Sequence, residues 1–457
     1  MIDQIILSQI ERIKKKLILA KDIDKDFKVF GADSHQYVLG ETVSNDVILK
    51  FENDFNVSLP ESYKAFLIHI GNGGISYENS AAGPCYGIFS FGENVDEFVY
   101  SNTEKYLKEG CILYPGLSDE FWKELTKKIE EDEDISNEDF ETELGKIYSG
   151  ILPISSQGCT YYYGLVLSGE YKGRIVNVDL DRQKPFFAFE SNFLDWYERW
   201  LDEIASESVA EQTDLFHYTL GGALTHILNV FIDAEGEETK LECLKGVLRK
   251  QKIDSQTLDV LEKEYKSSKA EIREKLLQIL VKFDYDRAYP YLVHFVKEDI
   301  LSVFQFVFWY AKDRSSDWLE FIKQNTERIS DEETFQFCTY LLQEMNLDYG
   351  DVILPFALNE NNEIRRQLYY SLGQLENKRD YIDTFIMGLN DDANWVIHSA
   401  LQALDGVEDD KLLIHYKRVA ERFPKEQDYI LVNLNHRLKP FGLTNKSIKK
   451  LNFEKYK

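Results

Sequence analysis

The sequence predicts an α+β N-terminal domain, with a small, mostly antiparallel sheet flanked by helices, followed by an all-α C-terminal domain built as an α-solenoid. Three observations predict this division. Short β-rich runs separated by turn residues stop before residue 190. Beyond Leu220 the apolar residues follow helical spacing alone, and an apolar triplet recurs there at a fixed period. At 457 residues and 44% hydrophobic composition, the chain can bury the cores of about two to four compact units.

The first elements are helices. An amphipathic helix is predicted over residues 1–20, where three consecutive lysines interrupt any signal-like apolar run. Two short helices are predicted over residues 47–70. Pro60 suits the first turn of the second helix, because its missing N–H group is harmless there. The glycine-rich segment 71–74 then supplies residues that tolerate left-handed backbone, and it ends that helix.

Short strands and a closing helix complete the predicted N-terminal domain. The closing helix covers residues 193–204, whose aromatic and aliphatic residues share one face, and a small, acidic stretch at 205–213 marks the boundary. We therefore expect domains at residues 1–206 and 214–457, with an acidic insert near 101–148 in the first. The strand candidates are Tyr86–Phe91, Tyr161–Leu167, Arg174–Leu180 and Pro185–Phe189.

The helical domain is predicted from apolar residues at positions i, i+4 and i+8. Stacked helical pairs bury a shared stripe that no single pair can bury, which explains a fixed period near 32 residues. An irregular helical bundle with a coincidental period is the alternative. The copies are Ile272, Leu276 and Leu280, then Ile364, Leu368 and Leu372, then Val396, Ala400 and Leu404; Val303, Val307 and Ala311 and, more weakly, Phe335, Cys338 and Leu342 lie near the missing registers.

The first domain carries, in order, the motifs Leu59-Pro60-Glu61-Ser62-Tyr63, Phe66-Leu67, Gly71-Asn72-Gly73-Gly74 and Tyr86-Gly87-Ile88-Phe89. With these motifs it resembles the SUKH superfamily, and its Smi/Knr-like branch in particular. The resemblance covers about residues 28–205, with a long insert between its two motif blocks, and it implies no catalytic residues. The second domain resembles HEAT-type repeats, since Ile272-Arg273 and Ile364-Arg365 stand where that repeat often has an apolar-Arg pair. The motif positions that we expect to be structural are Leu59, Pro60, Tyr63, Phe66, Gly71, Gly73, Gly74, Tyr86 and Gly87, with Leu152-Pro153-Ile154 and Phe193-Leu194-Asp195-Trp196 further along.

Composition and motif spacing argue against several kinds of chemistry. The net charge of −27 disfavours nucleic acid, because binding a polyanion needs Lys and Arg to neutralise phosphates, and it suits a basic partner. No stretch approaches a membrane span, and five scattered cysteines indicate free thiols in a cytoplasmic protein. The glycine cluster lacks the Lys-Ser/Thr of a phosphate loop, and no His or Cys has metal-ligand spacing. We expect no cofactor, metal or catalytic residue, although a site assembled from distant residues stays open.

Two features are candidate contact surfaces. The stretch from Glu130 to Glu143 contains nine carboxylates and no base, which indicates either a solvated loop or frayed helix end, or a surface that docks on a basic partner. The consecutive Tyr161, Tyr162 and Tyr163 cannot all point inward on a strand, so at least one is expected to be exposed; a core role with a cross-strand pair is the alternative. The carboxylates that we select for partner binding are Glu130, Glu131, Asp132, Glu133, Asp134, Glu138 and Asp139.

The resemblance implies a binding role. Bacterial SUKH proteins are similar in role to immunity proteins that neutralise polymorphic toxins, many of them nucleases or deaminases, while fungal relatives look like scaffolds in cell-wall synthesis. Our leading hypothesis is a protein-binding immunity protein that masks the active surface of a basic toxin domain, with nucleases among the candidates. A scaffold or adaptor is the second hypothesis, and an enzyme is a distant third.

Overall fold

The chain forms two compact units in the computed structural model. The structure describes residues 4–74, 80–132, 134–206, 220–423 and 428–453. Unit 1 comprises Met1–Leu276 and unit 2 comprises Leu277–Lys457. The predicted boundary at residues 205–213 lies mostly outside the described residues, so the division into domains at 1–206 and 214–457 stays a prediction. The first helices after that boundary belong to unit 1.

Unit 1 is organised around one antiparallel sheet. Its six strands lie in the order in which they occur along the chain, so every strand pairs with its sequence neighbour. The four predicted strands are confirmed, though shortened at their ends, and two further strands, β1 and β3, were not predicted. The strands are β1 (Ser80–Ala81), β2 (Ile88–Phe89), β3 (Ile151–Gly158), β4 (Tyr161–Val166), β5 (Ile175–Asp179) and β6 (Phe186–Phe187).

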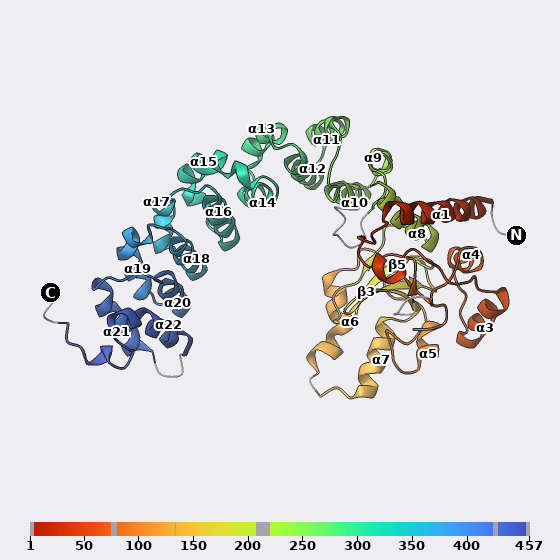
Figure 1. The fold of residues 1–457 in the computed structure, drawn as a ribbon, viewed down its shortest axis with the longest axis horizontal. Helices are drawn as coiled ribbons and strands as arrows, with labels where there is room; N and C mark the ends of the chain where they lie inside the picture. The colour runs from red at the N-terminus through yellow and green to blue at the C-terminus, as the bar shows by residue number, and fades with distance from the viewer. Residues whose placement is uncertain (1–3, 75–79, 133, 207–219, 424–427, 454–457) are drawn as a thin grey trace. The chain divides into compact units, whose positions relative to one another are not determined.

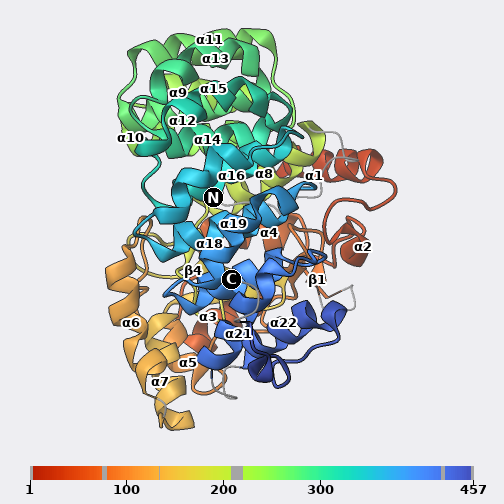
Figure 2. The same cartoon turned by 90° about the vertical axis from the view of Figure 1, so that its left-hand side faces the viewer.

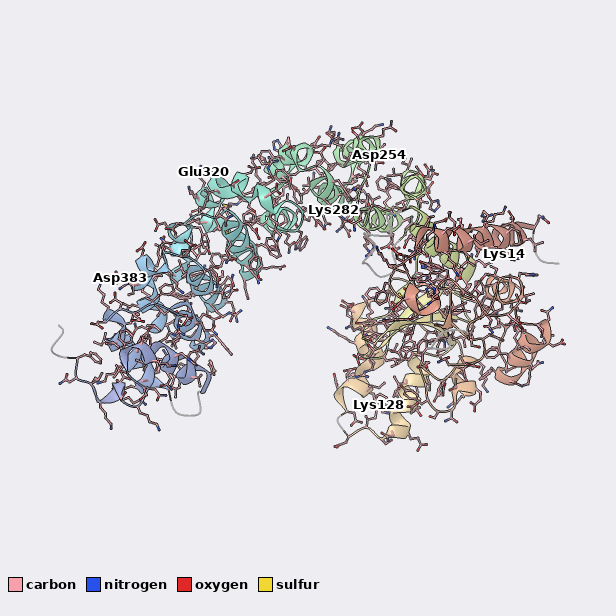
Figure 3. All side chains as sticks on the ribbon, in the orientation of Figure 1. Lys14, Lys128, Asp254, Lys282, Glu320 and Asp383 are labelled. Carbon is pink, nitrogen blue, oxygen red and sulfur yellow. The ribbon has the colours of Figure 1, made fainter. Side chains whose placement is uncertain are left out.

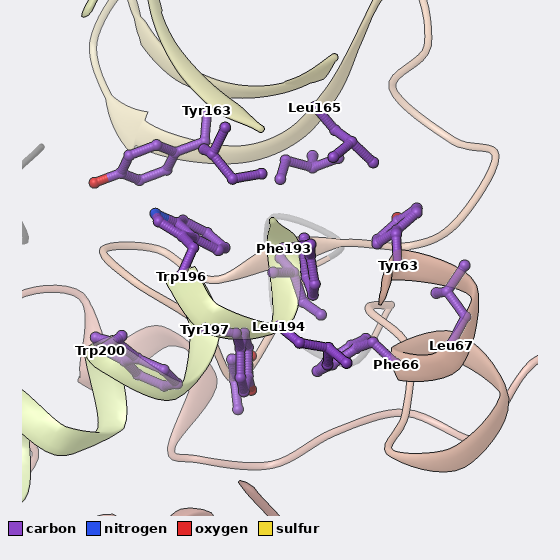
Figure 4. Close-up of a cluster of buried hydrophobic side chains, with 14 of the residues drawn as sticks. Tyr63, Phe66, Leu67, Tyr163, Leu165, Phe193, Leu194, Trp196, Tyr197 and Trp200 are labelled. Carbon is purple, nitrogen blue, oxygen red and sulfur yellow. The ribbon is translucent and has the colours of Figure 1, made fainter. Parts of the chain in front are cut away.

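One face of the sheet packs on a cluster of aromatic side chains (Figure 4). The central strand β4 contributes Tyr163, whose ring centroid lies 5.1 Å from that of Trp196 on the closing helix. Phe66 packs against Phe193 and Tyr197 of the same helix, at 5.1 and 4.7 Å. The predicted helices are confirmed on this face. They are α1 (Gln4–Ile23), α3 (Asn45–Phe55), α4 (Glu61–His69) and α8 (Phe193–Ser206); the short helix α2 (Ala32–His35), between α1 and α3 in the chain, was not predicted.

The opposite face of the sheet is covered by the long connection between β2 and β3. This connection is the predicted insert, and it forms α5 (Thr103–Leu107), α6 (Asp119–Glu131) and α7 (Asn137–Ile147). Trp122 of α6 and Ile147 of α7 join Val176 and Val178 of β5 in a second apolar cluster. Ser118 and Ser136 accept the N–H groups of Phe121 and Asp139, so each long helix has an N-cap where its apolar stripe begins.

The glycine cluster does more than end a helix. Helix α4 ends at His69 with Pro60 as its N-cap, one residue before the predicted position. A Cβ atom on Gly73 would lie 2.2 Å from backbone atoms of Phe89 and Ser90, and Gly74 has φ +90° in the left-handed region. Backbone therefore passes directly against backbone here, which only glycine permits.

Four helices follow in unit 1 before or across the division between the units. They carry the first predicted triplet, since Ile272, Leu276 and Leu280 are buried. A Cβ on Gly246 would lie 1.9 Å from the carbonyl oxygen of Leu220, so the start of this region packs closely on its second helix. The helices are α9 (Leu224–Asp233), α10 (Glu237–Leu248), α11 (Ser255–Ser267) and α12 (Ala270–Phe283).

Unit 2 consists of helices in two layers (Figure 1). The even-numbered helices contact one another in sequence, α14 with α16, α16 with α18, α18 with α20 and α20 with α22, and the odd-numbered helices lie on their other side. The α-helices are α13 (Tyr285–Phe295), α14 (Ile300–Tyr310), α15 (Leu319–Gln324), α16 (Glu332–Glu344), α17 (Gly350–Ile353), α18 (Asn362–Gly373), α19 (Ile382–Leu389), α20 (Asn394–Ala403), α21 (Lys411–Arg422) and α22 (Asp428–Leu438). Short 3-10 helices lie at Lys312–Trp318, Thr326–Arg328, Leu354–Leu358, Lys378–Tyr381, Lys439–Phe441 and Ile448–Lys450.

The predicted triplets fall on every second helix. The strongest copies lie on α12, α18 and α20, and the two copies in the missing registers lie on α14 and α16, with all fifteen residues buried. Because each apolar stripe is covered by the neighbouring helices, the fixed period of the triplets arises from the packing of the helices in this region. Arg365 on α18 joins one pair to the next, since it bonds both carboxylate oxygens of Asp391 at 2.8 and 2.9 Å.

Candidate protein-binding surfaces

The acidic run from Glu130 to Glu143 caps one end of a helical hairpin. Glu130 and Glu131 lie in the last turn of α6, and Glu138 to Glu143 belong to α7, so a loop is the wrong description for most of the run, whereas an exposed helix end describes Glu130 and Glu131. The physical reason is that Trp122, Ile129, Leu144 and Ile147 give these helices an apolar face, which the sheet buries. The carboxylates lie on the remaining, solvent-facing side. Figure 2 shows α6 and α7 side by side, and Figure 3 labels Lys128 on this hairpin. Glu133 lies outside the described residues.

Several of the selected carboxylates are paired within unit 1. Glu130 accepts a bond from Arg182 at 2.5 Å. Lys128 on α6 lies 3.6 Å from Asp139 and 3.1 Å from Glu143 on α7, which fastens the two helices together. Its hydrogen bonds with Lys146 and Lys128 lower the pKa of Glu143, so this group stays ionised at neutral pH. These pairs hold the hairpin, and they leave Glu130 and Asp139 less available to a partner.

Four selected carboxylates face solvent without a cation: Glu131, Asp132, Asp134 and Glu138. All four are exposed, and within the described residues none forms a salt bridge. Glu131 lies in the last turn of α6, where the helix dipole favours a base instead of an acid. Glu138 lies in the first turn of α7, where the dipole favours it. An unpaired acid at a helix C-terminus does nothing for local stability, so Glu131 is not needed to hold α6.

The tyrosine triple is less accessible than predicted. Tyr163 is fully buried against α8, while Tyr161 and Tyr162 are half-buried, so none of the three is exposed. The side chains do alternate between faces, as expected, but both faces of the sheet are covered. The Tyr162 ring lies 5.9 Å from that of Phe98 in the second apolar cluster. The core alternative therefore describes Tyr163, and only Tyr161 and Tyr162 retain partial access.

Most of the motif positions lie in the packed interior, while Tyr86 is half-buried and Gly74 is exposed. Leu59, Tyr63 and Phe66 are buried in the first cluster. Gly87 has φ +91°, and a Cβ there would lie 2.0 Å from the carbonyl oxygen of Ala81. Tyr86 packs its ring 5.3 Å from that of Phe30. These residues contact other parts of the same domain, so their role is structural.

A buried histidine lies beside this scaffold. His35 Nδ1 accepts the N–H of Tyr37 at 3.1 Å, and its ring lies 5.8 Å from that of Trp200. Burial lowers the pKa of His35 to about 4, so the imidazole is neutral at physiological pH. A proton added to His35 Nδ1 would point at the Tyr37 N–H group, which now donates its hydrogen bond to that nitrogen. This residue is a structural acceptor, and sequence reasoning did not single it out.

Sequence reasoning also missed a cavity of about 590 Å³ in unit 1. It lies beside the edge strand β6, and Phe187 and Phe189 supply apolar walls. Arg174 reaches into it, with Nη2 donating to the carbonyl of Ala188 at 2.6 Å, and burial lowers the pKa of its guanidinium. Helix α10 adds Glu238 to the lining. Because these residues come from three separate segments, no local pattern could have grouped them.

The cysteines and acidic groups of the described residues form no evident reactive or metal-binding cluster. All five cysteines lie in described segments, and no disulfide joins any two of them. Within those segments no group of three or more His, Cys, Asp or Glu side chains is arranged to hold a metal ion. Every described helix falls short, in length or in apolar content, of what a bilayer crossing requires.

Unit 1 therefore contains a structural domain with a six-stranded sheet between two helical layers and an acidic hairpin on its outside. Residues 42–199 match the model of the SMI1 / KNR4 family (SUKH-1). The match begins before α3, ends within α8 and includes the α5–α7 connection. Comparisons with curated proteins and with solved structures each gave no match. The SUKH-1 resemblance of the sequence is confirmed for this region, and the helices that follow it are not assigned to a family.

Proposed function

We propose that this chain is an immunity-type protein that binds a toxin domain with a basic active surface and masks it, without catalysing a reaction. The observation that carries the proposal is the SUKH-1 match at residues 42–199 combined with an exposed acidic hairpin inside that match. Proteins of this family are generally associated with protein binding. A nuclease is a suitable toxin class, since a groove that binds nucleic acid is lined with cations.

The hairpin supports a basic partner on electrostatic grounds. Glu131, Asp132, Asp134 and Glu138 leave a cluster of unneutralised charge on one end of the domain. Such a cluster accelerates the encounter with an oppositely charged surface and competes with a polyanionic substrate for the same cations. The half-buried Tyr161 and Tyr162 lie on β4 and belong to the proposed contact set with less access.

We further propose that the helical region forms an α-solenoid of HEAT-like repeats. Buried triplets on every second helix, and contacts between successive even-numbered helices, support this description. A solenoid offers a long second surface to the same partner. The cytoplasm is the proposed location, since a toxin of this kind acts there on nucleic acid.

A growth assay tests the proposal. The candidate toxin is the product of the gene beside this one, expressed under an inducible promoter with and without the full chain. We expect the chain to restore growth. The triple variant Glu131→Gln, Asp134→Asn, Glu138→Gln should restore it less well, because it removes the unpaired charges and leaves the Lys128 pairs intact.

The matched control removes three charges elsewhere. Asp22→Asn, Glu41→Gln and Glu170→Gln change by the same amount three exposed acids of unit 1 that lie outside the hairpin and form no salt bridge in the described structure, and this variant should restore growth fully. Equal rescue by the two triple variants would contradict the role of the hairpin. If the product of the adjoining gene is harmless, or if it is toxic and the chain does not relieve the toxicity, the immunity role is contradicted and the adaptor role is favoured.

A further inference from the structure

The cavity beside β6 has no part in the function proposed above. Its volume of about 590 Å³ lies within the range of about 300–1,000 Å³ that ligand pockets occupy. All the residues that line it belong to unit 1, and they come from residues 115–117, from residues 184–189, from Arg174 and from α10. Pro115, Leu117, Phe186, Phe187 and Phe189 supply apolar walls. A single unit therefore builds a largely apolar site of ligand size.

Arg174 differs from the other arginines that precede the helical region. Each of those forms a salt bridge with a carboxylate, namely Arg12 with Glu198, Arg182 with Glu130 and Arg199 with Glu190. Arg174 is half-buried, and its Nη2 donates only to the carbonyls of Ala188 and Phe189, at 2.6 and 3.4 Å. Within the described residues no carboxylate forms a salt bridge with it. A cation that is partly withdrawn from water without a counter-charge is unfavourable, so an anionic group in the cavity would stabilise Arg174.

Glu238 provides the opposite charge in this cavity. It is exposed in the first turn of α10, and no cation of the described chain forms a salt bridge with it. Burial lowers the pKa of Arg174, and the nearby charges of Glu190 and Glu238 oppose that shift. The other charged residues of the lining are paired, Lys184 with Asp119 at 2.5 Å and Lys245 with Glu242 at 2.6 Å. The cavity therefore has one cation and one anion that are close enough to influence each other but do not form a salt bridge.

The open edge of the sheet lies along the same cavity. Strand β6 is the last strand of the sheet and pairs with β5 on one side. Phe186 and Phe187 point to opposite faces of the sheet, and because both line the cavity, the cavity follows the edge of the strand. Ala188 donates its N–H to Ile175 of β5 at 2.8 Å, so the alternation of an antiparallel pair turns the N–H and C=O of Phe187 outward. No described residue beyond the sheet bonds these two groups, and an added strand would satisfy both.

We propose that this cavity binds a short apolar peptide with free termini, whose carboxylate pairs with Arg174, whose ammonium group pairs with Glu238 and whose main chain extends the sheet at Phe187. Two extended residues place the terminal charges about 7 Å apart, which suits two side chains that do not reach each other. The peptide side chains pack on Phe186 and Phe189. A ligand with one charge would leave either the cation or the anion unpaired. The inference does not rest on the proposed function, because it uses neither the hairpin nor a toxin.

Titration calorimetry of the purified full chain with three dipeptides tests the proposal. The first probe is leucyl-leucine, which has both terminal charges. The second is N-acetyl-leucyl-leucine, which lacks the ammonium group, and the third is leucyl-leucine amide, which lacks the carboxylate. We expect leucyl-leucine to bind and each capped form to bind about tenfold more weakly, because each loses one charge-assisted contact. Absence of binding by leucyl-leucine, or equal binding by either capped form, would overturn the proposal.

Two variants assign the terminal charges to their partners. Arg174→Gln should weaken leucyl-leucine about tenfold and leave the amide unchanged, and Glu238→Gln should weaken leucyl-leucine about tenfold and leave the acetylated form unchanged. Arg182→Gln and Glu235→Gln are the matched controls, since both positions lie outside the lining, and both should bind leucyl-leucine normally.

The Glu238→Gln arm decides the outcome even if Arg174→Gln disturbs the fold, because Glu238 is exposed. Unchanged binding of leucyl-leucine by Glu238→Gln would overturn the proposal, and so would an equal loss for all three peptides in a folded Arg174→Gln variant. Thermal unfolding of each variant checks the fold. These outcomes are independent of the growth assay, because no toxin is present.

Discussion

The SUKH-1 region and unit 2 use opposite strategies to bury their cores. In the first, together with helix α1 that precedes it, side chains far apart in sequence meet: Gln9 bonds Glu198 across 189 positions, and the Tyr197 hydroxyl bonds the carbonyl of Ala82 across 115. In unit 2 the bonds join helices that are close in the chain, as Arg365 does with Asp391 across 26 positions and Asn433 with His398 across 35. A core that is formed by segments far apart in sequence is expected to fold and unfold as one unit. A row of helices that contact mainly their neighbours in the chain can unfold locally.

The largest expected effect separates these two kinds of core. Phe66→Ala and Phe335→Ala each remove a fully buried ring and should cost about 3–5 kcal/mol of unfolding free energy. Hydrogen exchange should show that Phe66→Ala lowers the protection of the whole sheet together with α4 and α8. Phe335→Ala should lower protection only in α16 and its neighbouring helices. Loss of protection throughout unit 2 would show that its core also unfolds as one unit, and would contradict the prediction.

Acid should weaken the first region more than the second through His35. Its folded pKa of about 4 lies below the unfolded value near 6.5, so the contribution is fully present above pH 6.5 and is lost as the pH falls toward 4. The full shift corresponds to about 3 kcal/mol. Urea unfolding at pH 7 and pH 5, followed in the SUKH-1 region, measures it. His35→Gln should flatten this dependence, and an unchanged slope would contradict the assignment.

A smaller effect is expected at the junctions of unit 2. Arg365 is largely buried between Asp391 and the carbonyls of Asn359 and Glu360, and the hydrogen bond with Asp391 raises its pKa. Arg365→Gln removes the bidentate pair and leaves a partly buried carboxylate, at a cost of about 2 kcal/mol. Denaturant unfolding should show this loss, with the SUKH-1 region unaffected. The exposed pair of Lys323 and Glu320 is the control, since Lys323→Gln should change stability by less than about 0.5 kcal/mol.

The smallest effect on stability is expected at the hairpin. The triple variant Glu131→Gln, Asp134→Asn, Glu138→Gln should unfold within about 0.5 kcal/mol of the unaltered chain, because none of the three carboxylates forms a salt bridge in the described structure. Its association rate with the basic partner should fall roughly tenfold at low salt and less at high salt. Stopped-flow mixing at two ionic strengths measures both. A large loss of stability would show that these acids stabilise the fold, and would contradict the prediction.

Helices with a clear apolar face were predictable, and so was the period of the triplets, because these patterns depend on neighbours in sequence. Strand β3 was missed because both of its faces are covered, so it lacks alternation, and because Pro153 and the polar Ser155 interrupt its apolar residues. The exposure of Tyr161 to Tyr163 was overestimated for the same reason. The cavity beside β6 is lined by segments that are far apart in the chain, so Arg174 and Glu238 gave no signal in the sequence.

Under the proposed function the chain acts by occupying a protein surface. The most direct measurement is a titration of the purified chain into a fixed amount of active toxin, with residual toxin activity and complex formation followed together. Binding predicts that inhibition rises linearly and saturates at one equivalent, with the toxin recovered in a complex and active again after dissociation. Complete inactivation by a small fraction of an equivalent, with the toxin covalently altered, would contradict the account and identify an enzyme.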